Sequence, residues 1–402
     1  MIQEFQKYVI ALGGAVATPE SANRPHERVF RKLNLFAKEI INDVSTLEAY
    51  IKPSDFPDIE FAIINNKKSN AFAYPSKNGN HYLIGVYSGL VLRMYNILCE
   101  ALRNQTNLLR YCSHNAYQQV SADNIALIDE KTKNPPDMAH LIHTFDQNIH
   151  TEESNQSLDD EYTIELIEDI VTYAIEFLIM HETAHILRNH FGVYKNSNEP
   201  NNINMFDEES ALTLFCSSNK HSKANRLKRG LEADADMQAI FMSYRKMEPH
   251  IDEDEPENER ADFLYDDIFL RCFAIGTVFM LLDNGQALEE QITDHPPSYL
   301  RLLYIQDYIR RYHEFESDID DEQCVEECLN ALLELENLAM LLNFNRGRWI
   351  RTEQPDKNGN YLHEINQLVY SSLFEKEEHL ITSVSDLIDQ STDACFIDGV
   401  AL

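Results

Sequence analysis

Residues 161–190 read EYTIELIEDIVTYAIEFLIMHETAHILRNH, and this stretch decides the fold that we expect. Its apolar residues recur at steps of three and four, which is the period of a helix that buries one face. The series consists of Ile164, Ile167, Val171, Ala174 and Leu178. His181 and His185 continue the same series. The sequence therefore predicts a buried helix that carries two imidazoles on its inner face.

The two histidines belong to the segment HETAH, which has the HExxH pattern. Histidines four residues apart project from neighbouring turns of a helix, so both ring nitrogens can reach one metal ion. Glu182 follows the first histidine. It can take a proton from a water molecule that the metal holds and pass it to a leaving amine. The alternative is a helix with two ordinary buried histidines, because a pattern this short also arises by chance.

A third metal ligand is expected in the segment KRGLEADADMQAIF, residues 228–241. Glu232 and Asp236 are four residues apart on a predicted helix, so Glu232 can complete a His-His-Glu site. Asp236 can then hydrogen-bond a ligating histidine and orient it. Asp234 lies about half a turn away and is a poorer candidate. The alternative is a solvated acidic helix face.

A third histidine close to HETAH would indicate a different class of metallopeptidase, the metzincins. That class continues with a glycine and then a histidine, but Arg188 and Phe191 occupy those places here. His190 is out of step with the pattern. We therefore place the third ligand on the later helix.

Two further motifs complete an ordered set. Residues 70–73 read NAFA, and residues 294–301 read DHPPSYLR. Together with HETAH and EADAD, they resemble the motifs of gluzincin metallopeptidases, especially the M48-like group. The chain is more similar still to the phage-exclusion peptidases, peptidase family U49, which also have an apolar helix like the one around FAIG at 273–276. The resemblance covers about residues 160–310.

The resemblance implies a zinc-dependent endopeptidase of the bacterial cytoplasm. One Zn²⁺ per chain would be held by His181, His185 and Glu232, and the target would be a specific intracellular protein, in phage defence. An unselective cytoplasmic protease would harm its host, so we also expect the enzyme to be held inactive. Two alternatives from other classes are a binding or regulatory protein with a closed, non-catalytic metal site and a hydrolase of small amides.

His295 and Arg301 each have two interpretations. Either side chain could hydrogen-bond the oxyanion that forms during attack on a carbonyl, which would make both catalytic. The resemblance to the M48-like group also allows His295 to act as a regulatory fourth metal ligand. Alternatively, His295 and Pro296 cap a helix, and Arg301 pairs with an acidic residue.

The whole chain predicts a mostly helical α+β fold. We expect a zincin-like arrangement, in which the HExxH helix lies beside a small antiparallel sheet, with extra helices at the C-terminal end. Residues 1–57 are predicted to be an N-terminal helical segment, and residues 58–312 the metallopeptidase domain. Within it, the polar insert at 113–160 either covers the active site or is a variable surface segment. Residues 313–402 form a mostly helical C-terminal region.

The sheet is predicted from a strand at 58–65 and a hairpin around Asn78-Gly79, a dipeptide that favours tight turns. The first strand of the hairpin could bind an extended substrate through its backbone, if it lies at a sheet edge. Its substrate-binding residues would be Asn70, Ala71, Phe72 and Ala73. The alternative is an ordinary inner strand.

Helices are predicted at 25–51, 89–109 and 263–282. We expect Gly192 to end the metal helix and residues 250–262 to form an acidic linker. We expect no stretch of the sequence to reach membrane-spanning length, and the most apolar run, at 272–282, is predicted to be a core helix.

Composition excludes several classes of partner. The chain has 402 residues, 44% of them hydrophobic, and a net charge of −33. Such a charge repels phosphate backbones and anionic membranes, so we expect neither nucleic acid nor a membrane as a partner. The protein or peptide substrate is what the resemblance implies. Seven cysteines without tight spacing suggest reduced thiols in a cytoplasm. Cys324 and Cys328 are one helical turn apart, and they are either ordinary helix residues or part of a second zinc site.

Overall fold

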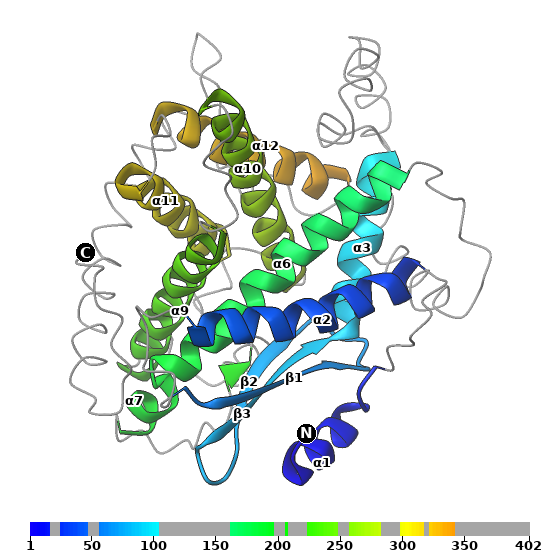
Figure 1. The fold of residues 1–402 in the computed structure, drawn as a ribbon, viewed down its shortest axis with the longest axis vertical. Helices are drawn as coiled ribbons and strands as arrows, with labels where there is room; N and C mark the ends of the chain where they lie inside the picture. The colour runs from blue at the N-terminus through cyan, green and yellow to red at the C-terminus, as the bar shows by residue number, and fades with distance from the viewer. Residues whose placement is uncertain are drawn as a thin grey trace.

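Figure 1 shows the computed structural model of the chain. It describes residues 1–16, 25–46, 56–103, 161–196, 206–207, 223–247, 257–282, 298–316 and 321–341. The predicted insert at 113–160, His295 and the part of the C-terminal region after residue 341 lie outside the described residues.

The described part of the chain is mostly helical with one small sheet, which confirms the α+β class. The helices are α1 (Gln3–Leu12), α2 (Pro25–Thr46), α3 (Ser88–Arg103), α6 (Glu161–Leu187), α7 (His190–Asn196), α9 (Lys223–Met247), α10 (Glu257–Leu282), α11 (Ser298–Glu316) and α12 (Asp321–Leu341). The strands are β1 (Asp58–Ile64), β2 (Ala71–Pro75), β3 (His81–Tyr87) and β4 (Phe206–Asp207). The helices predicted at 25–51, 89–109 and 263–282 are present as α2, α3 and α10. However, α10 begins at Glu257, inside the stretch predicted as a linker.

The sheet is mixed, so the prediction of an antiparallel sheet is wrong. The strand order is β1-β3-β2-β4. β2 pairs antiparallel with β3 and with β4, whereas β1 pairs parallel with β3. The physical reason is that β3 lies between β1 and β2. Because those two strands run in opposite directions, the strand between them must be parallel to one of them.

The predicted hairpin is present, but its turn is longer than the two-residue turn that Asn78-Gly79 favours. The N–H of Gly79 donates to the carbonyl oxygen of Ser76 at 2.9 Å, and the N–H of Ser76 donates to the carbonyl oxygen of His81 at 2.8 Å. Gly79 has φ 73°, and Asn78 is not among the described residues with positive φ. One positive φ, supplied by glycine, is therefore enough to reverse the chain here.

The two faces of the sheet are buried against different elements. Alternate residues along each strand point to opposite faces. One face packs against α1, and the other faces α2, α3 and α6 (Figure 1). The face toward α1 is formed by Ala62, Ile64, Phe72, Leu83 and Tyr87. The face toward the main core is formed by Ile63, Ala71, Ala73, Ile84 and Val86.

Helix α6 runs through the middle of the protein and is buried on more than one face. It packs against α2, α3, α9 and α10 and against strands β2 and β3. The predicted inner series is buried from Ile167 onward, but so are most residues between its members. The expectation of one buried face is therefore too narrow. A helix that is apolar all round is one that neighbours surround completely.

Residues Ile164–Leu187 are long and apolar enough to cross a membrane, by length and composition alone. The prediction that no stretch reaches that length is therefore wrong. However, 94% of the most apolar window of this segment is buried inside the protein. The packing described above accounts for its apolar character without a membrane.

The first and third predicted regions share the core of the middle region. One cluster of buried residues includes Val29 and Leu33 of α2, Phe279 of α10 and Leu335 of α12. A Cβ atom added to Gly276 of α10 would lie 2.2 Å from a methyl carbon of Leu335, so α10 and α12 approach closely at this glycine. In the described residues, α2 and α12 are thus parts of one packed body with α6.

A buried ionic cluster outside the HETAH segment joins α6 to α10. The guanidinium of Arg271 binds the carboxylates of Asp267 at 2.7 Å and of Glu176 at 3.0 Å. It also lies over the rings of Tyr173 and Tyr244, at 4.5 and 5.5 Å from their centroids. We call these five residues the Arg271 cluster. Burial raises the pKa of Asp267 above its usual range even though Arg271 acts against this.

His313 of α11 contacts the Arg271 cluster and should make stability depend on pH. Its ring meets that of Tyr244 edge-on, with centroids 4.8 Å apart. Burial and the charge of Arg271 lower the pKa of His313 to about 4. Below the ordinary histidine pKa of about 6.5, the unfolded chain binds a proton that the folded chain does not. Stability from this residue is therefore full above about pH 6.5 and is lost as the pH falls toward 4.

We expect His313→Phe to reduce this pH dependence. The free energy of unfolding should fall between pH 7 and pH 5 by about 1–2 kcal/mol less in the variant than in the wild type. Urea unfolding with a chelator present, so that metal binding does not contribute, measures the difference. Tyr312→Phe alters a neighbouring ring without changing a group that titrates in this range, and serves as the control. Equal pH dependence in wild type and His313→Phe would contradict the prediction.

Candidate metal centre

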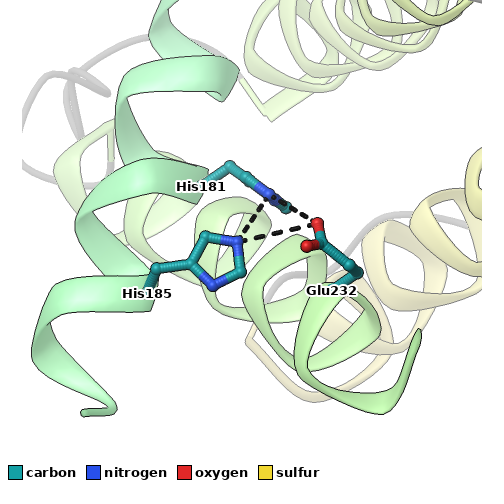
Figure 2. Close-up of side chains that lie close together, drawn as sticks. All are labelled: His181, His185 and Glu232. Carbon is teal, nitrogen blue, oxygen red and sulfur yellow. Dashed lines mark hydrogen bonds and ion pairs between the residues drawn. The ribbon is translucent and has the colours of Figure 1, made fainter. Parts of the chain in front are cut away.

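The structure brings His181, His185 and Glu232 together. Both histidines come from α6, and the packing of α9 against α6 places Glu232 opposite them (Figure 2). The two histidine Nε2 atoms are 3.0 Å apart. Glu232 Oε2 lies 3.2 Å from His181 Nε2 and 3.6 Å from His185 Nε2. The three side chains that the sequence predicts as ligands therefore point at one spot.

The spacing of these three atoms fits a metal ion. Four ligands placed tetrahedrally at zinc's usual bond lengths have ligand atoms about 3.3–3.5 Å apart. The observed separations of 3.0, 3.2 and 3.6 Å bracket that range. All three residues are at most 2% exposed. The described residues thus contain a buried His-His-Glu group that could hold one metal ion.

Asp236 orients His181, as its spacing from Glu232 predicts. Its Oδ1 atom lies 2.9 Å from His181 Nδ1. This contact assigns a hydrogen to Nδ1, because an ionised carboxylate only accepts, and it leaves Nε2 directed at Glu232 and His185. Burial acts to raise the pKa of Asp236, but the charge of Arg301 and the hydrogen bonds from Arg301 and His181 outweigh it and lower this pKa.

Arg301 binds Asp236 with two parallel hydrogen bonds. Its Nε donates to Oδ2 at 2.9 Å and its Nη2 donates to Oδ1 at 2.8 Å. The guanidinium also lies over the ring of Phe279, 4.2 Å from its centroid. The structure therefore shows the second of the two predicted interpretations, an ion pair with an acidic residue. Arg301 reaches the metal group through Asp236 and His181.

The surroundings shift the pKa values of His181 and His185 in opposite directions. Burial disfavours a charge on both rings. At His181, hydrogen bonds to Asp236 and Glu232 outweigh burial and raise the pKa to about 10. At His185, burial dominates and lowers the pKa to about 3. Protonation is therefore favoured at His181 over His185, and metal binding would require a deprotonated Nε2 on each ring.

The end of α6 differs from the prediction. The helix ends at Leu187, and Asn189 takes a positive φ of 52° before α7 begins at His190. Asparagine tolerates this left-handed conformation better than most residues. Gly192 lies inside α7, so the prediction that it stops the metal helix is wrong. Its N–H donates to Asn189 Oδ1 at 3.1 Å, and a Cβ atom at Gly192 would lie only 2.5 Å from that oxygen.

The turn at Asn189 brings His190 back against His185. The two Nδ1 atoms are 2.7 Å apart, and His190 Nε2 lies 3.0 Å from Asp234 Oδ2. Arg188 binds the same carboxylate through Nε at 3.2 Å and Nη2 at 3.3 Å. Burial acts to raise the pKa of Asp234, but His190 and Arg188 outweigh it and lower this pKa. Neither His190 nor Asp234 belongs to the His-His-Glu group, but together they contact one of its histidines.

The sequence does not predict this contact, because it excludes His190 as the third ligand and makes Asp234 a poorer candidate than Asp236. One signal was available. Asn189 is a residue that favours a reversal after a helix, and it stands between an arginine and a histidine. Two aspartates follow Glu232 at alternate positions, so one of them can face away from His181.

The predicted substrate-binding strand does not lie at a free edge of the sheet. Phe72 pairs with Gly85 of β3 on one side and with Asp207 of β4 on the other. The side chains of Asn70, Ala71, Phe72 and Ala73 are all buried. The structure therefore shows the alternative interpretation, an inner strand, because β4 comes from a distant part of the sequence and pairs with β2.

Cys324 and Cys328 are buried thiols of α12, and Cys272 of α10 lies beside them. The sulfur atoms of Cys272 and Cys328 are 3.8 Å apart. In the described parts of the chain, the only group of three histidine, cysteine or acidic ligand atoms close enough to hold a metal ion is the His-His-Glu group. The cysteines therefore do not form a second metal site of that kind there.

No family model, curated protein or solved structure matches the chain.

Proposed function

We propose that the protein is a zinc-dependent endopeptidase that cleaves a specific intracellular protein. The observation that carries the proposal is the triangle of His181, His185 and Glu232 ligand atoms, with Glu182 adjacent to the first ligand on the same helix. Two imidazoles and one carboxylate form a known donor set of catalytic zinc sites, in which a fourth position stays open. Calcium and magnesium prefer sites made of oxygen ligands alone.

The proposed chemistry divides between the ion and the side chains. Zinc held there would polarise a peptide carbonyl and lower the pKa of a water molecule to about 7. Glu182 would accept a proton from the attacking water and deliver it to the leaving nitrogen. Asp236, fixed by Arg301, would hold His181 in the tautomer that presents Nε2 as a ligand. Among the residues of HETAH, only Glu182 would transfer a proton in this mechanism.

Burial supports a second candidate, a binding or regulatory protein with a closed metal site. His181, Glu182 and His185 are each only 1% exposed, and Glu232 is 2% exposed. A substrate needs access to the ion, so a peptidase with this structure must open, which agrees with the expectation of a latent enzyme. A structural site would instead stay closed and take a fourth protein ligand.

Metal removal tests the proposal directly. We expect one zinc ion per chain in the purified protein and loss of that ion in His185→Ala and Glu232→Ala, because each change removes one of three ligands. His313→Phe removes a buried histidine elsewhere and should keep the ion. Elemental analysis of the dialysed proteins measures the content. A wild type without metal would overturn both candidate functions.

Cleavage separates the two candidates. Extracts of uninfected and phage-infected bacteria should each be incubated with the wild type, the chelator-treated protein and the same protein after zinc is restored. The peptidase proposal, including a role in phage defence, predicts a discrete cleaved protein that depends on zinc, at least in the infected extract. Zinc binding without cleavage in either extract would favour the closed, non-catalytic site.

A further inference from the structure

One ring nitrogen of His185, Nε2, faces Glu232, and the other, Nδ1, contacts a further histidine, His190. We propose that His190, anchored by Asp234 and Arg188, is a positioning residue that fixes the ring orientation and tautomer of His185 and so sets the affinity of the site for its metal. This inference rests on the proposed metal site. It concerns residues that are themselves not ligands.

The contacts form one continuous chain from the ligand to an ion pair. His185 Nδ1 and His190 Nδ1 are 2.7 Å apart, and the two ring centroids are 4.8 Å apart at 76°. His190 Nε2 lies 3.0 Å from Asp234 Oδ2. His185, His190 and Asp234 are each at most 1% exposed. Water is therefore a poor substitute for any of these partners.

The positions of the hydrogens fix which atom donates and which accepts at each contact from His185 to Asp234. To bind a metal through Nε2, neutral His185 must carry its hydrogen on Nδ1. That hydrogen points at His190 Nδ1, which must therefore accept. His190 then carries its own hydrogen on Nε2, where the carboxylate of Asp234 can accept it. Each nitrogen and oxygen in the chain is satisfied in this assignment, and the lone pair of His185 Nε2 is directed at the ligand group.

Arg188 fixes the far end of the chain. Its two hydrogen bonds to Asp234, at 3.2 and 3.3 Å, hold both carboxylate oxygens. Two-point binding of this kind restricts rotation of the carboxylate as well as its position. Asp234 can therefore hold the His190 ring, and His190 can hold the ring of His185.

The series of contacts from His185 to Arg188 resembles the arrangement at His181. There, Asp236 Oδ1 lies 2.9 Å from His181 Nδ1, and Arg301 binds the same carboxylate. Alternate residues of α9 thus provide the ligand Glu232 and two anchoring aspartates, each bound by an arginine. On the His185 side, His190 bridges the ligand and the carboxylate. A histidine packed only for stability would not need to connect His185 to an aspartate that an arginine binds.

The test compares metal affinity among variants that keep the ligands. His190→Phe keeps a ring but removes the acceptor for His185 Nδ1, so the dissociation constant for zinc should rise by about 10–100-fold in competition with a chromophoric chelator. Asp234→Asn should weaken binding in the same range. Because the two residues act in one chain, the double variant should lose little more than the larger single loss. His313→Phe, the same substitution at another buried histidine, should bind zinc like the wild type.

A spectroscopic readout makes the test independent of activity. Cobalt(II) bound in place of zinc reports ligand geometry through its visible absorption, which we expect to change in His190→Phe and to remain unchanged in His313→Phe. Thermal unfolding with a chelator present identifies variants that fail to fold. If His190→Phe is one of them, Asp234→Asn carries the test, because it keeps the side-chain volume.

The outcomes separate this inference from the proposed function. Wild-type affinity and an unchanged cobalt spectrum in folded His190→Phe or Asp234→Asn would overturn the positioning role and leave the metal site intact. Additive losses of zinc affinity in the double variant would also overturn it, because independent effects would mean that His190 and Asp234 do not act through each other. Failure of the wild type itself to bind zinc or cobalt would instead overturn the proposed function, and this inference with it.

Discussion

Glu182→Gln should abolish most peptide hydrolysis while leaving one zinc ion per chain. Glutamine has nearly the volume of glutamate, so a side chain that is 1% exposed can be replaced without a cavity. It cannot accept the proton of the attacking water. General acid–base catalysis by one side chain contributes about 10²–10⁴-fold, and we expect a loss of that size. The rate of appearance of the cleaved target, measured beside zinc content, gives the comparison.

The control for Glu182→Gln lies on the same helix. Glu165→Gln removes an identical charge from an exposed position of α6, remote in sequence from the ligands, and should cleave at the wild-type rate. Substantial residual activity in Glu182→Gln, with zinc bound, would show that another group activates water. Loss of zinc in this variant would instead mean that Glu182 holds the ion or its surroundings together.

Arg271→Met should lower the free energy of unfolding by about 3–5 kcal/mol, the largest stability effect that we expect. Removing one partner of a buried ionic group leaves the others charged in an apolar region. Here two carboxylates, those of Asp267 and Glu176, would lose their shared cation. Both are buried, so water cannot take the place of the guanidinium. Urea unfolding at pH 7 measures the loss.

A surface ion pair supplies the matched control. Lys32 of α2 binds Asp169 of α6 at 2.8 Å, but both side chains are more than 40% exposed. Lys32→Met should therefore cost about 1 kcal/mol or less. If Arg271→Met also carries Asp267→Asn and Glu176→Gln, part of the lost stability should return, because no uncompensated charge remains buried. Equal losses in Arg271→Met and Lys32→Met would contradict this expectation.

The ligand group could be predicted from the sequence because its members obey local rules. HETAH fixes the spacing of His181 and His185 on any helix, and the four-residue step from Glu232 to Asp236 likewise fixes their common face. The hairpin between β2 and β3 follows from a glycine between two short apolar strands. Helical packing of α6 against α9 then brings the predicted residues together over a long interval of sequence.

The missed features depend on contacts that no local pattern contains. Periodicity reports which face of α6 is most apolar, but it does not report how many neighbours surround the helix. The pairing of β4 with β2 joins residues near 206 to residues near 72, and neither segment shows which partner it will choose. His190 became relevant only once the turn at Asn189 and the position of Asp234 on α9 were both known.

The position of the ligand group on two helices has a further consequence for the chain as a whole. An ion shared by α6 and α9 would join residues 185 and 232 and close the long interval between them. A ligand that binds only the folded state stabilises it in proportion to the logarithm of its free concentration, by about 2.7 kcal/mol at one hundred times its dissociation constant. The amount of folded protein would therefore follow the supply of metal. A cell that starves the chain of zinc would lower its abundance as well as its activity.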